Sequence, residues 1–369
     1  MLLAYVIYTS LPLLMILSLR TISNRLVDKK FIYVNRRILQ HLIILLVTII
    51  IGYRYDVGSD YFSYEQMYLS QDSASFIERY GIEYIFYIIY HVCYKLGVSY
   101  NFALCVLNII PICLLYKTFR GQKVFAWIII MLFLSGQFFL HLNIVRQSIA
   151  LFVLIYSTSY IRRRLFARFI VCVIIAAGFH TSAVLFVPFY FIPYLSAIIK
   201  NRRLQYLLFI GTLLFSDIIL NTLVDVMAIV MQYTPYAQYG DLLTTYEVQT
   251  GSGVGVIMKA ISGLAIINYS TQLSNKYKKY GFDVFYLIYF AGALKSNIFG
   301  VTSLLLLRLI FLFDSFRFIV LGYLFHFLYG ARGITQHVVF MILISGYIAY
   351  FIGMIYLHNS HCSPWQFAL

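Results

Sequence analysis

Long apolar segments, separated by short polar ones, recur from one end of the 369-residue chain to the other. A helix needs about 20 residues to cross the ~30 Å hydrocarbon core of a bilayer, and many of these segments approach that length. Lipid offers no partners to backbone N–H and C=O groups, so a crossing segment must satisfy those groups within a helix. The pattern therefore predicts an all-α integral membrane protein, folded as a single polytopic domain over residues 1–369.

The apolar segments correspond to about 12 transmembrane helices, within a range of roughly 10 to 13. The predicted spans are residues 3–19, 38–53, 101–116, 124–140, 148–161, 168–180, 183–199, 204–221, 256–270, 283–299, 303–328 and 334–356. A further stretch, residues 82–97, is apolar but short, and its Tyr and Phe content suits the level of the lipid headgroups. We expect an interfacial or re-entrant helix there, because another crossing would move the next basic segment to the opposite side.

Most basic residues fall in clusters between the predicted spans, which is how membrane proteins encode their orientation. With the spans above, all the clusters lie on one side, and the positive-inside rule makes that side cytoplasmic. Both termini and two polar loops, about 54–100 and about 222–255, are then expected on the outer side. The net charge of +15 therefore indicates membrane topology and not a nucleic-acid partner.

The composition agrees with this picture, since 62% of the residues are hydrophobic and 11% are charged. A soluble domain would be roughly one quarter charged. The five cysteines show neither a metal-ligand spacing nor a disulfide framework, and only Cys362 is expected to face water. No Asp-x-Asp pair is present to bind a metal ion. We therefore expect no cofactor and a metal-independent activity.

Several cations lie outside the basic clusters, in the outer half of the predicted membrane region: Arg54, Arg146, Lys259, Lys295 and Arg308. A cation in hydrocarbon costs at least about 2.5–3.5 kcal/mol on insertion scales, so several on one side indicate a wet cavity or an anionic ligand. Arginine binds pyrophosphate well, because its planar fork makes bidentate, permanently charged contacts. Two cations have simpler interpretations: Lys259 can snorkel to a membrane boundary, and Arg317 can pair with Asp314 three residues earlier.

The polar segment GYRYDVGSDYFSYEQMY, residues 52–68, directly follows the second predicted span. Gly58 is expected to give the backbone freedom for a tight turn beside Asp60. The concentration of charged and aromatic groups predicts a binding site for an anionic, sugar-bearing ligand. In the simpler alternative, Asp56 and Asp60 neutralise Arg54, and these contacts only order the loop without forming a binding site.

Two further features stay open between structure and function. Tyr61, Tyr64 and Tyr68 have the i, i+3, i+7 spacing of one helix face, which serves either packing or stacking on sugar rings. His180 ends the sixth predicted span in AAGFHTS, where a histidine acts either as an interfacial residue or as a proton acceptor.

Three stretches together resemble the EpsG-like branch of the bacterial polysaccharide polymerases, the Wzy-type O-antigen polymerases. They are YRYDVGSDYFSYEQMY (53–68), NIVRQSIALFVLIYSTSYIRRR (143–164) and IIAAGFHTSAVLFVPFYF (174–191). The order and spacing of the three stretches match that family over about residues 50–191. The C-terminal third is similar only in its hydrophobic pattern, although Arg308 corresponds to a late arginine of the family.

The resemblance implies a multi-pass glycosyltransferase of the bacterial inner membrane, with its active site facing the periplasm. Such enzymes act on undecaprenyl-pyrophosphate-linked oligosaccharides. The growing chain leaves its lipid and joins the non-reducing end of a new lipid-linked repeat unit, which builds O-antigen or a related surface polysaccharide. The partners are then the lipid-linked oligosaccharide and the bilayer, and whether a chain-length regulator also binds stays open.

Under this hypothesis, Arg54, Arg146 and Arg308 hold the pyrophosphates and stabilise charge on the leaving diphosphate. Asp60 and His180 are the candidate bases for the acceptor hydroxyl, and Glu83 is the third. The other candidates for substrate binding are Gly58, Tyr61, Tyr64 and Gln147.

Two other functions fit part of the pattern. A flippase for the same lipid-linked unit also needs a cationic cavity, but it should show two related halves and no long polar outer loop. An O-antigen ligase shares the lipid donor and the architecture. The long polar loop and the lack of a visible repeat favour the polymerase over the flippase.

Overall fold

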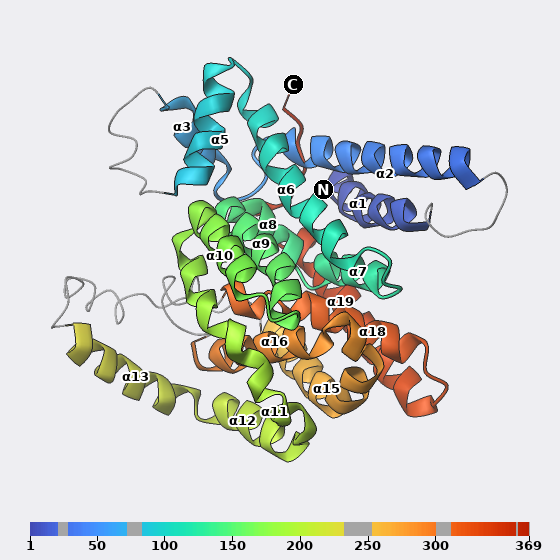
Figure 1. Cartoon of the computed structure of the whole chain (residues 1–369), viewed down its shortest axis with the longest axis vertical. Coiled ribbons are helices and arrows are strands. Elements are labelled where there is room, and N and C mark those ends of the chain that lie inside the picture. Colours follow the sequence, from blue (N-terminus) through green and yellow to red (C-terminus); the bar gives the residue numbers. More distant parts are fainter. Residues whose placement is uncertain (21–28, 72–82, 232–252, 300–310, 359–360, 369) are drawn as a thin grey trace. The chain divides into compact units, whose positions relative to one another are not determined.

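The computed structural model describes residues 1–20, 29–71, 83–231, 253–299, 311–358 and 361–368 (Figure 1). Within these ranges the regular elements are helices, and the only strand-like pairing is an isolated antiparallel bridge between Arg54 and Phe367. The predicted all-α class is therefore confirmed. The chain divides into two compact units, one formed by residues 1–187 with 347–369 and the other by residues 188–346. The single polytopic domain stays a prediction.

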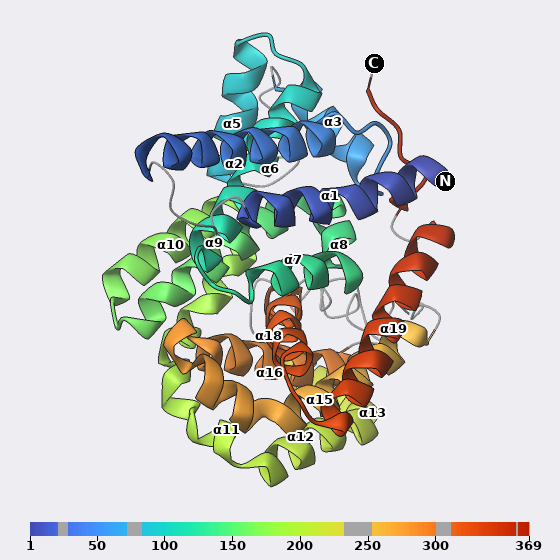
Figure 2. The same cartoon turned by 90° about the vertical axis from the view of Figure 1, so that its right-hand side faces the viewer.

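Among the described residues of the first unit, most belong to nine α-helices. They are α1 (Leu2–Arg20), α2 (Lys29–Gly52), α3 (Tyr61–Leu69), α5 (Tyr84–Lys95), α6 (Tyr100–Phe119), α7 (Phe125–Leu134), α8 (Gln137–Asn143), α9 (Val145–Arg162) and α10 (Phe166–Phe179). Helix α9 packs against α10 and α6, and α6 packs against α2, which lies beside α1 (Figures 1 and 2). Apolar residues are buried all round α9, including Ile149, Leu151 and Ile155, so α9 is the central helix of this unit.

The second unit holds the remaining helices of the described residues. They are α11 (Ala197–Lys200), α12 (Arg202–Leu214), α13 (Ser216–Met231), α15 (Val254–Tyr277), η3 (Lys278–Tyr280), α16 (Phe282–Phe299) and α18 (Arg317–Tyr329). Two elements continue from one unit into the other, the 3₁₀ helix η1 (Thr181–Leu195) and α19 (Ile334–Tyr356). Helix α16 packs against α12, α13, α15 and α18. At Gly292, α16 also closely approaches the turn before α18, where a Cβ would lie 2.5 Å from the carbonyl carbon of Phe313.

Several predicted spans are broken or short. The segment 124–140 is two helices, α7 and α8, that meet at 66° where Gly136 adopts the left-handed conformation with φ of 79°. Helices α12 and α13 are bent by 76° within the predicted span 204–221. The predicted span 183–199 lies mostly in η1, whose Pro188 and Pro193 lack the N–H groups that an α-helix needs.

Among the described residues, five helices are long and apolar enough to cross a membrane, or up to seven if each bent pair is one span. These five are Leu2–Leu19, Tyr100–Phe119, Val254–Tyr280, Phe311–Tyr329 and Ile334–Tyr356. The predicted number of about 12 is not confirmed, and part of the span 303–328 lies outside the described residues. Several apolar helices nevertheless fit a multi-pass membrane protein, as the pattern predicts.

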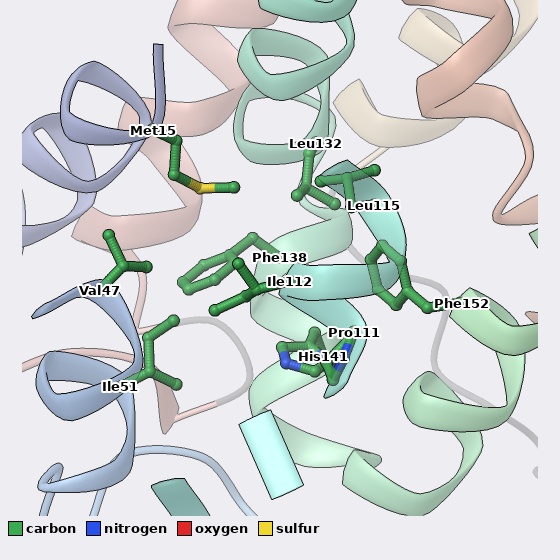
Figure 3. Close-up of a pocket in the computed structure, with 10 residues that line it drawn as sticks. All are labelled: Met15, Val47, Ile51, Pro111, Ile112, Leu115, Leu132, Phe138, His141 and Phe152. Atoms are coloured by element: carbon green, nitrogen blue, oxygen red, sulfur yellow. The ribbon is translucent and has the colours of Figure 1, made fainter. Parts of the chain in front are cut away.

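The first unit also contains a small apolar cavity between α1, α2, α6, α7, α8 and α9 (Figure 3). Its volume is about 20 Å³, close to what one water molecule needs. Its lining is apolar except for His141, whose Nε2 lies 2.9 Å from Oδ1 of Asn108. A sugar or a diphosphate cannot enter such a space, so this cavity is a packing defect and not the substrate site.

Candidate active site

Three ionisable side chains from separate parts of the first unit meet at one place: Glu83, Arg146 and His180. The Glu83 Oε1 atom lies 2.6 Å from Nδ1 of His180, and its Oε2 atom lies 2.9 Å from Nη1 of Arg146. The backbone N–H of Thr181 also donates to Oε1, at 3.3 Å. Glu83 is largely buried, whereas the side chains of Arg146 and His180 are 24% and 21% exposed. The group is therefore held from within and partly open to a ligand.

The local sequence explains why these three residues meet. Glu83 is the residue before α5, Arg146 is in the first turn of α9, and His180 ends α10 with an extended backbone. Gly178 lies two residues before His180, and a Cβ there would be 2.5 Å from Cγ1 of Ile85 in α5. The absence of a side chain at Gly178 lets α5 approach α10, and this approach brings Glu83 to His180.

The Arg146 guanidinium also lies against two aromatic rings. Its Cζ atom is 5.8 Å from the ring centre of Tyr64 in α3 and 5.7 Å from that of Phe86 in α5. Burial raises the pKa of the Tyr64 phenol, and the positive charge of Arg146 opposes this rise. The guanidinium has five N–H donors, and Glu83 contacts one of its nitrogens. Arg146 is thus positioned by a carboxylate and two rings while part of its fork reaches the surface.

Arg54 has a different environment from the one predicted. Its side chain is fully buried, and each of its three side-chain nitrogens donates to a backbone carbonyl. These carbonyls belong to Ile51 at 2.9 Å, Val57 at 3.1 Å and Leu142 at 3.1 Å. The prediction that Arg54 binds pyrophosphate directly does not agree with this geometry, because its donors already hold the turn after α2. The simpler alternative, in which Asp56 and Asp60 neutralise Arg54, does not agree with the structure either. No carboxylate pairs with Arg54 among the described residues.

The turn that follows Arg54 is fixed against α8. Gly58 has a φ of 102°, and a Cβ there would lie 2.7 Å from Oδ1 of Asn143. That oxygen accepts a hydrogen bond from the backbone N–H of Ser59 at 2.7 Å. The predicted tight turn at Gly58 is confirmed, and the role of the glycine is to permit close packing as well as an unusual conformation.

The segment 361–368 fastens the same turn from its other side. The N–H groups of Tyr55 and Gly58 donate to the carbonyls of Gln366 and His361, at 3.0 and 2.8 Å. Cys362 was expected to face water, but it is 2% exposed, and burial raises the pKa of its thiol to about 12. A segment that resembles a polar tail in the sequence is therefore part of the scaffold.

The tyrosine stripe forms the buried face of α3, as its spacing predicts, since Tyr61, Tyr64 and Tyr68 are all buried. Tyr61 is 1% exposed, and its ring packs edge-on against those of Tyr55, Phe62 and Tyr100. This position serves packing and gives Tyr61 no face for a sugar ring. Tyr64 is the member of the stripe that contacts Arg146.

The remaining predicted residues have varied positions. Asp60 is the residue before α3 and is partly buried, and its charge acts on the Tyr64 hydroxyl. No hydrogen bond or ion pair that the structure gives joins Asp60 to His180. Gln147 is buried in α9 beside Arg146. Arg308 lies outside the described residues.

The arrangement around Glu83 suits proton transfer next to an anion. An ionised carboxylate only accepts hydrogen bonds, so neutral His180 presents its N–H to Glu83 through Nδ1 and keeps the lone pair on Nε2. A carboxylate in this position orients the imidazole and stabilises the imidazolium that forms when Nε2 takes a proton. Arg146 supplies a permanent positive charge to the same site.

The sequence model of the EpsG family matches residues 37–367 of this chain. The match includes both units and every described residue of the group around Glu83. A search of curated proteins and a search of solved structures found no match.

Proposed function

Because the chain belongs to the EpsG family, we propose that it is a membrane glycosyltransferase that polymerises undecaprenyl-pyrophosphate-linked oligosaccharides. The product is O-antigen or a related surface polysaccharide, and the reaction takes place at the periplasmic face of the bacterial inner membrane. Membership of the EpsG family and the apolar helices support a role in polysaccharide synthesis at a membrane. The observation that carries the specific proposal is the contact of Glu83 with both His180 and Arg146.

In this mechanism, His180 is the general base. Its Nε2 atom removes the proton from an acceptor sugar hydroxyl as the hydroxyl oxygen attacks the anomeric carbon of the donor. A new glycosidic bond forms, and the bond between that carbon and the lipid diphosphate breaks with its electron pair on the diphosphate oxygen. Glu83 holds the ring and stabilises the imidazolium, as its 2.6 Å contact with Nδ1 allows.

Arg146 acts on the leaving diphosphate. Its fork offers paired donors to two phosphate oxygens, and the charge that develops on the leaving group strengthens this interaction in the transition state. Glu83 and the rings of Tyr64 and Phe86 fix the guanidinium before the substrate arrives, so little reorganisation is needed during the reaction. Asp60 remains the second candidate base, because it lies at the start of the helix that carries Tyr64.

The test is a panel of single substitutions in cells that lack the native gene: Arg146→Ala, His180→Ala, Glu83→Gln and Asp60→Asn. Arg163→Ala is the matched control, because Arg163 is an exposed arginine at the opposite end of α9. The readouts are the polysaccharide ladder on a gel and the amount of protein in the membrane.

A polymerase predicts that Arg146→Ala and His180→Ala collapse the ladder to single repeat units, with normal protein levels and a normal ladder for the control. General-base assistance is worth about 10²–10⁴-fold, so the loss of polymer should be nearly complete. A full ladder from both variants would refute the assignment. Loss of even the single-unit product would indicate a flippase, and in vitro transfer of preformed polymer to a different acceptor would indicate a ligase.

A further inference from the structure

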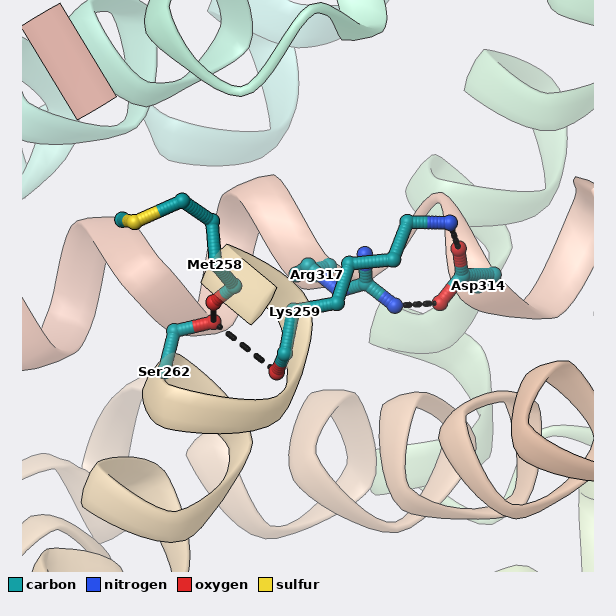
Figure 4. A network of polar contacts seen from close by, with 5 residues as sticks. All are labelled: Met258, Lys259, Ser262, Asp314 and Arg317. Atoms are coloured by element: carbon teal, nitrogen blue, oxygen red, sulfur yellow. Dashed lines mark hydrogen bonds and ion pairs between the residues drawn. The ribbon is translucent and has the colours of Figure 1, made fainter. Parts of the chain in front are cut away.

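A second group of cations meets in the second unit, at the turn before α18. Nζ of Lys259 lies 3.5 Å from Oδ2 of Asp314, and Arg317 forms an ion pair with the other oxygen of the same carboxylate (Figure 4). This confirms the predicted pair between Asp314 and Arg317. Nζ of Lys295 lies 4.6 Å from the ring centre of Phe313, the residue next to Asp314. Two cations thus share the Asp314 carboxylate and a third lies over the ring of the neighbouring residue, so the turn before α18 carries more positive than negative charge.

Close packing of the second unit brings these cations together. Lys259 comes from the start of α15, Lys295 from the second half of α16 and Arg317 from the first residue of α18. Gly292, three residues before Lys295, contacts the backbone of Phe313 directly and fixes α16 against this turn. The cluster is therefore a product of the fold and not of chance contacts between long side chains.

An apolar groove of about 430 Å³ adjoins the cluster. It is lined by six residues of η1 together with Ala291 of α16: Pro188, Phe189, Phe191, Ile192, Tyr194 and Leu195. Two contacts join the groove to the cations. The ring of Phe189 in the groove stacks on that of Phe313 at 4.6 Å, and Phe313 lies beneath Lys295. Ala291 is one helical turn before Lys295, so both lie on the same face of α16.

The chemistry of this surface matches one class of ligand. The side chain of Lys259 is 48% exposed while it pairs with Asp314, so its ammonium group is accessible to a ligand. An inorganic anion would not need the groove, and a neutral lipid would not need the cations. An amphiphile with a phosphate head and a hydrocarbon tail uses both.

We propose that Lys259, Lys295 and Arg317 bind the phosphate group of a lipid whose hydrocarbon chain lies in the groove formed by η1 and Ala291. Asp314 holds Lys259 and Arg317 in place without neutralising the cluster. The site belongs to the second unit, and the proposal stands independently of the polymerase mechanism at Glu83.

The test is a titration of the intact purified protein in detergent with dioleoyl phosphatidic acid, followed by native mass spectrometry. The variant is the double substitution Lys259→Ala with Lys295→Ala. Lys278→Ala is the matched control, because Lys278 is an exposed lysine just after the other end of α15. Thermal unfolding of each variant in the same detergent shows whether it is folded. Dioleoylglycerol and inorganic phosphate are the comparison ligands.

Two lysines near a phosphate are expected to account for about a tenfold or larger change in affinity, so the double variant should bind the lipid at least that much more weakly than the control. Ala291→Phe, which fills the groove and leaves the cations in place, should also weaken lipid binding. Unchanged binding in a folded double variant would overturn the proposal. Equal binding of dioleoylglycerol would reduce the site to an apolar groove, and binding of inorganic phosphate as tight as that of the lipid would reduce it to a free-anion site. Either result would contradict the assignment of a phosphate lipid.

Discussion

Arg54→Ala tests whether the buried arginine after α2 holds the fold or binds the substrate. The substitution removes the donors from three backbone carbonyls that are buried with the side chain. Each buried acceptor left without a partner costs about 1–3 kcal/mol, and the space left by the side chain adds a further cost. We therefore expect the free energy of unfolding to fall by at least about 3 kcal/mol, a large part of the 5–15 kcal/mol of a typical domain.

The assay compares the thermal unfolding of purified Arg54→Ala with that of Arg146→Ala in the same detergent, together with the amount of each protein in the membrane. Arg146→Ala is the right control because Arg146 is 24% exposed, and its loss leaves Glu83 bound to His180 and Thr181. Arg54→Ala should unfold at a clearly lower temperature and be depleted from the membrane. Arg146→Ala should remain stable and lose only polymerisation.

Arg54→Lys separates charge from geometry. A lysine keeps the positive charge, but its single nitrogen cannot reach three carbonyls arranged around a planar fork. We expect Arg54→Lys to be destabilised as well. If Arg54→Ala kept the thermal stability of the wild type and lost polymer, Arg54 would contact the substrate, and the structural role argued above would be wrong.

Three other predictions concern the same site. Gly178→Ala should disturb the contact of α5 with α10 and shorten the polysaccharide, because the added Cβ would lie 2.5 Å from Cγ1 of Ile85. A second substitution in the same chain, Ile85→Ala, should restore polysaccharide length and thermal stability. Additive losses in the double variant would contradict this coupling. Glu83→Gln should reduce polymerisation in vitro about tenfold or more at normal protein levels, since an amide still accepts from His180 but cannot stabilise an imidazolium; a wild-type rate would exclude this role. Deletion from residue 361 onward should lower the unfolding temperature and abolish polymer, because the turn at residues 53–58 loses its backbone partners, and a complete ladder from the shortened chain would refute this view.

Sequence patterns predicted the features that depend on neighbours along the chain. The helical class follows from the apolar segments, and the buried tyrosine face of α3 follows from helical spacing. The ion pair of Asp314 with Arg317 follows from a separation of three residues, and the turn at Gly58 follows from the freedom of glycine. Each of these depends on residues close in the sequence.

Features that depend on distant partners were missed. Arg54 was expected to face a ligand because it ends an apolar run beside aspartates, yet its partners include a carbonyl 88 residues away. Arg54 donates to the backbone carbonyl of Leu142, and the identity of the Leu142 side chain does not indicate that its carbonyl accepts this hydrogen bond. The breaks in the predicted spans have a similar origin, since Gly136 packs against Met354 from the far end of the chain, where an added Cβ would lie 2.7 Å from the sulfur.

Glu83 shows why the sequence alone did not reveal the centre of the candidate site. It was placed third among the candidate bases, since it is one of several carboxylates in a long polar segment and has no motif around it. Its importance comes from position, because it is the one group that contacts both His180 and Arg146 among the described residues. The two contacts have different roles, since His180 can take up a proton whereas Arg146 carries a permanent positive charge. Glu83 therefore links the proton acceptor to the cation, and a substitution there should impair both functions while leaving the fold in place.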